Sequence, residues 1–231
     1  MSFIYEFFRW LAVLTCYPFQ LLLFTKKLYY EDGGRRRIIR GGALIIANHY
    51  NVLDYMLDLY VVQPRRLNVV ASEYAYRNKL ITFGMRFFGG IQANRVTKDM
   101  SFMRKSADLI KKGELVLIFP EGQNTDDGTI KPFKQSYLAI AHRANAPIIP
   151  IVSDGNFKLF KRTRVIVGNP IYLSDLGISP ERMTRFERAD ANEIVYIRFF
   201  FCDGSLSASR QRKRTKINAK SSKFTKRSEY L

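Results

Sequence analysis

The feature that most limits the fold of this chain is a series of short, mostly apolar runs separated by segments with helical spacing. These runs are Ala43–Ala47, Leu67–Ala71, Leu115–Phe119 and Ile148–Val152. A short apolar run bounded by turn residues is typical of a strand that is buried on both faces. Between two of the runs, Asp99–Lys112 has the apolar spacing of an amphipathic helix, and Gly113 follows its end. Strands that alternate with helices predict an α/β fold, a single domain with a largely parallel central sheet flanked by helices.

The composition of the chain changes near both ends, and these changes define three segments. With 231 residues, the chain is long enough for one domain with a full core. We assign residues 1–30 to a membrane-associating N-terminal segment, 31–203 to the α/β domain and 204–231 to a basic tail. The tail is rich in Ser, Lys and Arg and poor in apolar residues, which predicts disorder. It could contact an anionic membrane surface or nucleic acid, or it could simply be solvated.

The N-terminal segment is apolar but short. Its apolar stretch, Trp10–Phe24, holds fifteen residues and contains Pro18. Crossing a bilayer takes about 20 apolar residues, and a proline kinks or splits a helix. We therefore expect one kinked helix or two short helices lying in the membrane interface, with a buried terminal helix of a soluble protein as the alternative. A single tilted span would have to bury Glu6 and Arg9, and Glu6 also departs from the pattern of a signal peptide.

The charge of the chain points to anionic partners. Its formal net charge is +18 at pH 7, which suits nucleic acid, an anionic membrane surface or acidic ligands. A basic cluster directly follows the apolar N-terminal stretch and consists of Lys26, Lys27, Arg35, Arg36, Arg37 and Arg40. That arrangement suits the anionic inner leaflet, so we expect a monotopic protein on the cytoplasmic face of the cell membrane. The two cysteines lie far apart in the sequence, and neither a disulfide framework nor a metal site is expected.

One of the two histidines, His49, lies at a predicted strand-to-helix turn. The strand Ala43–Ala47 precedes it, and Asn51 is a candidate N-cap for the helix that follows. Asp54 falls at the third helical position, from which a carboxylate reaches back to the cap. Beside the imidazole, that carboxylate would fix the tautomer of the ring and stabilise the imidazolium, which makes His49 a candidate general base. The alternative is an ordinary surface or capping contact between a histidine and an aspartate.

A second polar loop follows the predicted strand that ends near Phe119. In parallel sheets ligands bind beyond the carboxyl ends of the strands, so Glu121 and His49 are expected at the same edge. Gly122 would let the backbone approach a ligand closely. Arg95 follows another extended stretch. The alternatives are a carboxylate that only shapes its loop and an arginine that is only a surface residue.

The stretch Tyr74–Phe88 is rich in aromatic residues. Such a stretch is more often part of the core than of a ligand pocket. A groove for an acyl chain is the alternative, although the spacing of the aromatic residues does not indicate one.

Four short motifs follow one another between residues 42 and 151. They are Asn48-His49 with Asp54, Gly90–Arg95, Phe119-Pro120-Glu121-Gly122 and Ala146–Ile151, with Pro132-Phe133-Lys134 after the third. In order and approximate spacing they resemble the motifs of the lysophosphatidic acid acyltransferase family of glycerolipid acyltransferases, whose first motif is NHxxxxD. A single match would be weak, whereas four in order are strong. The resemblance implies that residues 31–203 are an acyltransferase domain.

The resemblance also implies a reaction. A fatty acyl group would move from a thioester of acyl carrier protein or coenzyme A to the free hydroxyl of 1-acyl-glycerol 3-phosphate, giving phosphatidic acid. His49 would take the hydroxyl proton and Asp54 would orient His49. Backbone amides near Glu121 and Gly122 would stabilise the oxyanion. Neither a cofactor, a metal ion nor an acyl-enzyme is implied.

The substrate-binding residues carried over from the family are Asn48, Arg95, Glu121 and Gly122. Arg95 would bind the acceptor phosphate through paired hydrogen bonds. This chain departs from the family at Asn124, where an arginine is usual. Either Lys131 or Lys134 compensates as a point charge, or the acceptor is not lysophosphatidic acid.

Two rival functions remain open. The first is the same chemistry on another lysolipid acceptor, for which the residue at position 124 is the argument. The second is a non-catalytic, basic protein that binds membranes or nucleic acid. It explains the net charge but not four motifs in family order, so nucleic acid is not an expected partner.

Overall fold

The computed structural model describes residues 26–32, 38–51, 54–94, 99–123, 129–155 and 163–202, together with positions 7, 8, 10, 11, 14 and 15. The elements in chain order are β1 (Lys26–Tyr30), β2 (Ala43–Ala47), α2 (Asp54–Val61), β3 (Leu67–Ser72), the 3-10 helix η1 (Glu73–Tyr76), α3 (Lys79–Phe87), β4 (Gly90–Ala93), α4 (Ser101–Lys111), β5 (Leu115–Ile118), α5 (Ser136–Ala144), β6 (Ile148–Ser153), β7 (Thr163–Val167), the 3-10 helix η2 (Ser174–Leu176) and α6 (Arg185–Cys202).

The strands form one seven-stranded sheet in the order β1-β7-β6-β2-β5-β3-β4. The pairings are parallel except for the antiparallel pair β6–β7. The prediction of an α/β domain with a largely parallel sheet is therefore confirmed. β2 is the middle strand, with Ile46 opposite Ile118 on β5 and Pro150 on β6. Its neighbours bring the carboxyl ends of three strands together at one edge of the sheet.

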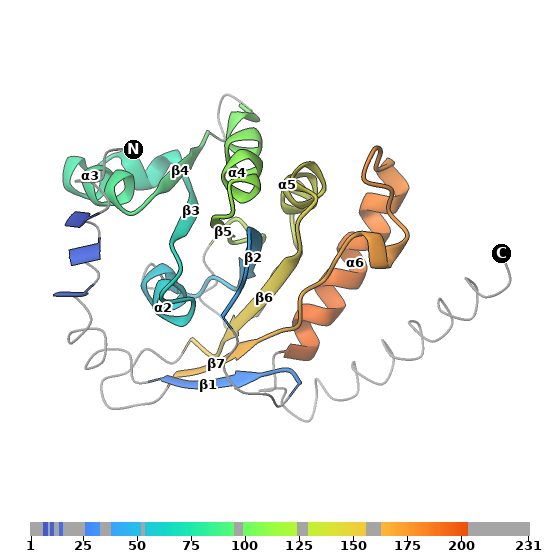
Figure 1. Cartoon of the computed structure of the whole chain (residues 1–231), viewed down its shortest axis with the longest axis horizontal. Helices are drawn as coiled ribbons and strands as arrows, with labels where there is room; N and C mark the ends of the chain where they lie inside the picture. Colours follow the sequence, from blue (N-terminus) through green and yellow to red (C-terminus); the bar gives the residue numbers. More distant parts are fainter. Residues whose placement is uncertain are drawn as a thin grey trace, which may run out of the picture.

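Helices cover both faces of the sheet, as Figure 1 shows. Successive residues of a strand point to opposite faces, and β2 follows this rule. Leu44 and Ile46 pack in a core shared with α4, α5 and α6, whereas Ala43, Ile45 and Ala47 pack in a second core with α2. Burial on both faces explains why the strand is apolar at every position. The predicted helix at 99–112 is confirmed as α4, and Gly113 follows it with a φ of 87°.

Strand β1 corrects the boundary predicted for the N-terminal segment. Residues 26–30, which that segment included, form an edge strand of the sheet, with Leu28 opposite Val165 of β7. Leu28 and Tyr30 are half-buried, and Lys27 and Tyr29 are exposed. This alternation is the two-residue period of a strand with one solvated face. The strand is short and follows directly on a longer apolar run, which is why its pattern was assigned to the N-terminal segment.

Two predicted features, the membrane-associating N-terminal segment and the disordered basic tail, are not tested by the structure. Most of the apolar N-terminal stretch and all of the basic tail lie outside the described residues. Positions 7, 8, 10, 11, 14 and 15 are helical, and their apolar side chains are exposed, including Trp10 and Leu14. None of the helices, as far as they are described, is long and apolar enough to cross a membrane.

The aromatic stretch 74–88 differs in part from the expectation that it belongs to the core. Tyr74 is 51% exposed and Phe83 is 69% exposed. Phe87 and Phe88, by contrast, are half-buried. The outer face of η1 and α3 is therefore unusually apolar for a solvated surface.

Candidate active site

The site forms where the middle strand of the sheet ends. Asn48 and His49 directly follow β2, and Asn48 is only 1% exposed. The side-chain amide of Asn48 donates to the carbonyl of Ser153 at the end of β6 (2.8 Å), and its oxygen accepts from the Ser153 N–H (2.9 Å). This amide thus pairs with the backbone of the next strand beyond the end of the β2–β6 ladder. The backbone at His49, the next residue, is therefore held in place at this edge of the sheet.

His49 and Asp54 form the predicted pair. His49 Nδ1 lies 3.1 Å from Asp54 Oδ2, and the carboxylate is 2% exposed while the imidazole is 20% exposed. The same oxygen accepts the backbone N–H groups of Tyr50 and Asn51, each at 2.7 Å. A carboxylate at the start of a helix that caps the preceding turn in this way cannot rotate away from the ring. The pairing favours a proton on Nδ1, which leaves the lone pair on Nε2 for a substrate.

Phe119 holds the imidazole from a second side. The ring of Phe119, directly after β5, stacks on the ring of His49 with centroids 4.0 Å apart and an interplanar angle of 13°. Sequence reasoning placed the Phe119 loop at this edge but gave the aromatic ring no role. The available signal was an aromatic residue at the carboxyl end of a strand expected beside the histidine strand. The stacking on Phe119 and the contact with Asp54 together restrict the orientation of the His49 imidazole.

Glu121 reaches the site from the β5 loop. It is 3% exposed, and its two carboxylate oxygens accept the backbone N–H of His49 (3.1 Å) and of Lys131 (2.8 Å). The structure thus gives Glu121, like Asn48, contacts that position the backbone. Direct contact of either side chain with a substrate stays a prediction.

Glu121→Gln is expected to lower both stability and activity. The amide has one acceptor oxygen instead of two, so one of the two backbone N–H groups loses its partner. Leaving a buried donor unsatisfied costs about 1–3 kcal/mol. Because one of these donors belongs to His49, kcat should fall as well. Urea unfolding and steady-state acyl transfer would measure the two effects.

Glu114→Gln is the matched control for this variant. Glu114 accepts from Asn68 (2.7 Å) and Arg66 (3.3 Å), but it precedes β5 at the opposite edge of the sheet. The Glu114→Gln substitution should lower the free energy of unfolding and leave kcat unchanged. If both variants keep the kcat of the wild type, Glu121 does not position the base.

Gly122 and Lys134 lie against each other in the same loop region. Gly122 has a φ of 71°, and a Cβ there would come 2.7 Å from Lys134 Nζ. The Lys134 N–H donates to the Pro120 carbonyl (2.9 Å), which fixes the lysine beside the loop. The Gly122 N–H donates to the Phe119 carbonyl (3.0 Å), so this amide already has an acceptor. Stabilisation of the oxyanion by backbone amides near Glu121 and Gly122 stays a prediction.

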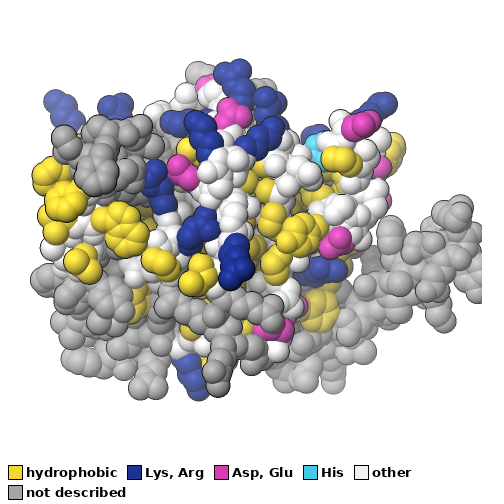
Figure 2. Space-filling model, in the orientation of Figure 1, with side chains coloured by type: hydrophobic (Ala, Val, Ile, Leu, Met, Phe, Trp, Pro, Cys, Tyr) yellow, Lys and Arg dark blue, Asp and Glu magenta, His cyan; other side chains and the backbone are white. Residues whose placement is uncertain are grey.

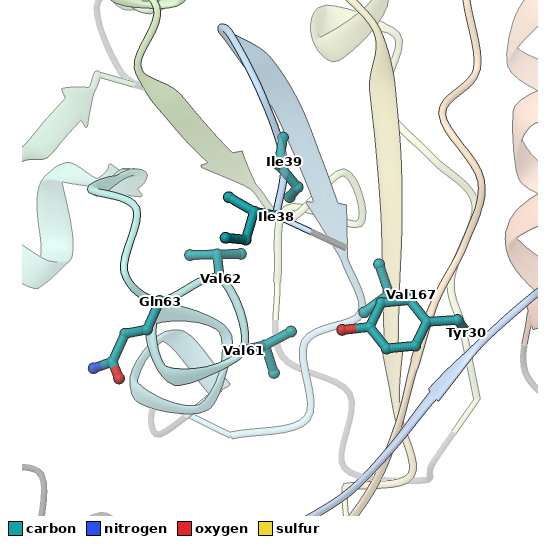
Figure 3. Close-up of a pocket in the computed structure, with 7 residues that line it drawn as sticks. All are labelled: Tyr30, Ile38, Ile39, Val61, Val62, Gln63 and Val167. Carbon is teal, nitrogen blue, oxygen red and sulfur yellow. The ribbon is translucent and has the colours of Figure 1, made fainter. Parts of the chain in front are cut away.

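The predicted site residues that the structure describes gather at this edge: Asn48, His49, Asp54, Glu121, Gly122, Lys131 and Lys134. Arg95 and Asn124 lie outside the described residues. The pocket in Figure 3 is a different place, lined by residues that include Ile39, Val62 and Val167. It lies at the end of α2 remote from Asp54, so it is not the site.

Cys202 is not a plausible nucleophile for the reaction. It lies at the end of α6 and is 2% exposed. Burial, with a smaller contribution from the Glu31 carboxylate, raises the pKa of Cys202 to about 12. The reactive thiolate is therefore scarce at neutral pH.

Asp58 is a second buried carboxyl on α2, one turn after Asp54. It is 2% exposed, and its Oδ2 has no hydrogen-bond partner in the described part of the chain. Burial, with the nearby Asp54 charge adding to it, raises the pKa of Asp58 well above its usual value of 3.8. Since the unfolded chain releases this proton at lower pH than the folded protein, folding becomes less favourable as the pH rises above that value.

Asp58→Asn is expected to remove this loss of stability. Relative to the variant, the wild type should lose free energy of unfolding as the pH is raised from about 4 towards neutrality. Urea unfolding at several pH values would measure the difference, with Asp108→Asn, an exposed carboxylate on α4, as the control for a lost charge. Curves for wild type and Asp58→Asn that run parallel with pH would contradict the assignment.

The sequence of this chain is similar to those of known proteins. The family model described as Acyltransferase matches residues 30–154, more than half of the chain. A 1-acyl-sn-glycerol-3-phosphate acyltransferase of Bacillus subtilis is 25% identical over 146 residues, which are 61% of this chain and 72% of that protein. The chloroplastic 1-acyl-sn-glycerol-3-phosphate acyltransferase BAT2 of Brassica napus is 27% identical over 139 residues, 55% of this chain and 40% of that protein. The human 1-acyl-sn-glycerol-3-phosphate acyltransferase beta is 30% identical over 129 residues, 52% of this chain and 44% of that protein.

The chain thus spans less than half the length of the plant and human relatives. Among solved structures, it is similar to the 1-acyl-sn-glycerophosphate acyltransferase PlsC of Thermotoga maritima, with a TM-score of 0.55 and 19% identity. That similarity covers 79% of this chain and 74% of the other, and it concerns the fold. The match of the family model includes β2, the His49–Asp54 pair, β5 and the Glu121 loop. The chain belongs to the Acyltransferase family.

Proposed function

We propose that this protein is a 1-acylglycerol-3-phosphate O-acyltransferase. It moves a fatty acyl group from a thioester donor to the free hydroxyl of 1-acyl-glycerol 3-phosphate and forms phosphatidic acid. The observation that carries the proposal is the His49–Asp54 pair, with Nδ1 and Oδ2 3.1 Å apart, at the carboxyl edge of the sheet. The relatives named for this activity support the choice of acceptor.

In this mechanism His49 acts as a general base and then as a general acid. Nε2 takes the proton of the acceptor hydroxyl as the hydroxyl oxygen attacks the thioester carbonyl. The tetrahedral intermediate then breaks its carbon–sulfur bond, and the imidazolium returns the proton to the leaving thiolate. Asp54 stabilises the imidazolium between the two steps. The products are a new oxygen ester and a free thiol, and the protein returns to its starting state.

The acceptor phosphate needs a fixed cation near this edge. Lys134 supplies one, because its Nζ lies over Gly122 in the loop that also holds Glu121. A lysine binds phosphate as a point charge. Arg95 stays a second candidate. Since position 124 is Asn where the family usually has Arg, the same chemistry on another lysolipid is the alternative.

The donor is a thioester of coenzyme A or of acyl carrier protein. Both donors are anionic, and a chain with a net charge of +18 suits either of them. No other cofactor belongs to the proposal. The same charge suits an anionic bilayer, and we place the protein on the cytoplasmic face of the cell membrane.

The test is acyl transfer by the purified, detergent-solubilised chain. Labelled acyl-coenzyme A and acyl carrier protein thioesters are offered with 1-acyl-glycerol 3-phosphate, lysophosphatidylcholine and lysophosphatidylethanolamine. We expect phosphatidic acid as the main product. Transfer only to another lysolipid would replace the acceptor and keep the chemistry. Folded protein that transfers to none of them would overturn the proposal.

A further inference from the structure

The outer face of α3 combines exposed aromatic and basic side chains. Lys79, Phe83 and Arg86 are exposed, and their spacing of three to four residues puts them on one side of the helix. Phe83 is 69% exposed and stacks on Phe87 one turn later, with ring centroids 6.2 Å apart. Leaving a phenylalanine in water is unfavourable, so a face of this kind indicates a surface that contacts something apolar.

The same combination continues on the 3-10 helix η1. Tyr74 is 51% exposed, and the guanidinium of Arg77 lies 4.6 Å from the centre of its ring. Between residues 73 and 90 the sole acidic residue is Glu73, which is half-buried. The outward charge of this surface is therefore positive. Figure 2 shows exposed hydrophobic side chains and basic side chains on the side of the molecule where α3 lies.

We propose that the face formed by Tyr74, Arg77, Lys79, Phe83 and Arg86 docks onto an anionic lipid bilayer. Aromatic rings that enter the acyl boundary while basic side chains remain at the headgroups are typical of interfacial helices. Positive charge complements the anionic lipids of a cytoplasmic leaflet. An acidic, polar partner such as acyl carrier protein would match the charge but would leave Phe83 without an apolar environment.

The position of this face determines which edge of the sheet would lie at the bilayer. η1 begins directly after β3, at the carboxyl edge of the sheet where His49 and Glu121 also lie. Docking would bring that edge to the bilayer surface, where a lysolipid acceptor resides. This consequence rests on the proposed function, whereas the docking itself does not.

A tryptophan reporter tests the docking directly. The chain has a single tryptophan, so a Trp10→Phe background lets Phe83→Trp report on α3 alone. The probe is a vesicle of phosphatidylcholine and phosphatidylglycerol whose acyl chains are brominated. Phe186→Trp is the matched control, because Phe186 is 84% exposed but lies on α6, on the opposite side of the molecule from α3 (Figure 1). We expect the emission of the Phe83→Trp protein to shift to the blue and to be quenched, and that of Phe186→Trp to stay unchanged.

A charge substitution gives a second readout. Phe83→Asp should weaken vesicle binding of the full chain by about tenfold or more, and Phe186→Asp should leave it unchanged. Both experiments measure binding to vesicles, so they test the docking even if the protein shows no acyl transfer. Vesicle-bound protein whose Phe83→Trp emission does not change would overturn the proposal. So would an emission that responds to acyl carrier protein but not to vesicles.

Discussion

His49→Ala is expected to lower kcat for acyl transfer by at least about 10²–10⁴-fold, the usual contribution of a positioned base. Among the described residues at this edge, His49 alone has a ring nitrogen that can take the hydroxyl proton, and the variant loses it. The fold should remain, because the imidazole is 20% exposed and lies outside the two cores. Steady-state rates and circular dichroism of the same preparation would measure both effects.

His142→Ala is the matched control for the loss of a histidine. His142 lies on α5, and its Nε2 pairs with the carbonyl of Ser179 (2.8 Å), away from the described site residues. The activity of this variant should equal that of the wild type. Folded His49→Ala protein with unchanged turnover would exclude His49 as the base.

Asp54→Asn is expected to separate the catalytic and structural contributions of this carboxylate. The amide oxygen can still accept the backbone N–H groups of Tyr50 and Asn51, but the charge that stabilises the imidazolium is gone. We expect kcat to fall by on the order of 10²–10⁴-fold. The free energy of unfolding should change little by comparison.

Asp54→Ala provides the contrast. It leaves the backbone N–H groups of Tyr50 and Asn51 without this acceptor. A donor left unsatisfied away from water costs about 1–3 kcal/mol, and the cost is smaller where water reaches it, as at the exposed Asn51. This variant should lose activity and also unfold at lower urea concentration than Asp54→Asn. If Asp54→Asn turned over at the rate of the wild type, the carboxylate would be a helix cap and no part of the mechanism.

The local parts of this site were predictable from the sequence. The His49–Asp54 contact forms within one strand-to-helix turn, so the spacing of five residues was enough to predict it. The four mostly apolar runs form the strands β2, β3, β5 and β6, as expected for strands buried on both faces. The exception is the buried Asn68 of β3, whose amide donates to Glu114. The common edge of His49 and Glu121 followed from the parallel arrangement, and the 3.1 Å bond confirms it.

Contacts between distant segments were not predictable in the same way. Asn48 and Ser153 are 105 residues apart, and their pairing depends on β6 lying beside β2, which no local pattern specifies. The stacking of Phe119 on His49 depends equally on β5 lying on the other side. The exposure of Phe83 was missed because an apolar side chain is expected in the core unless a surface has another partner.

The central claim is that His49 activates the acceptor hydroxyl for direct transfer, without an acyl-enzyme. A single-turnover experiment tests it most directly. Excess protein is mixed with radiolabelled acyl thioester, with and without 1-acyl-glycerol 3-phosphate, and quenched in denaturant. We predict that the label passes to phosphatidic acid only when the acceptor is present, and that none stays on the denatured protein. Label that is covalently bound to the protein before the acceptor arrives would contradict the claim.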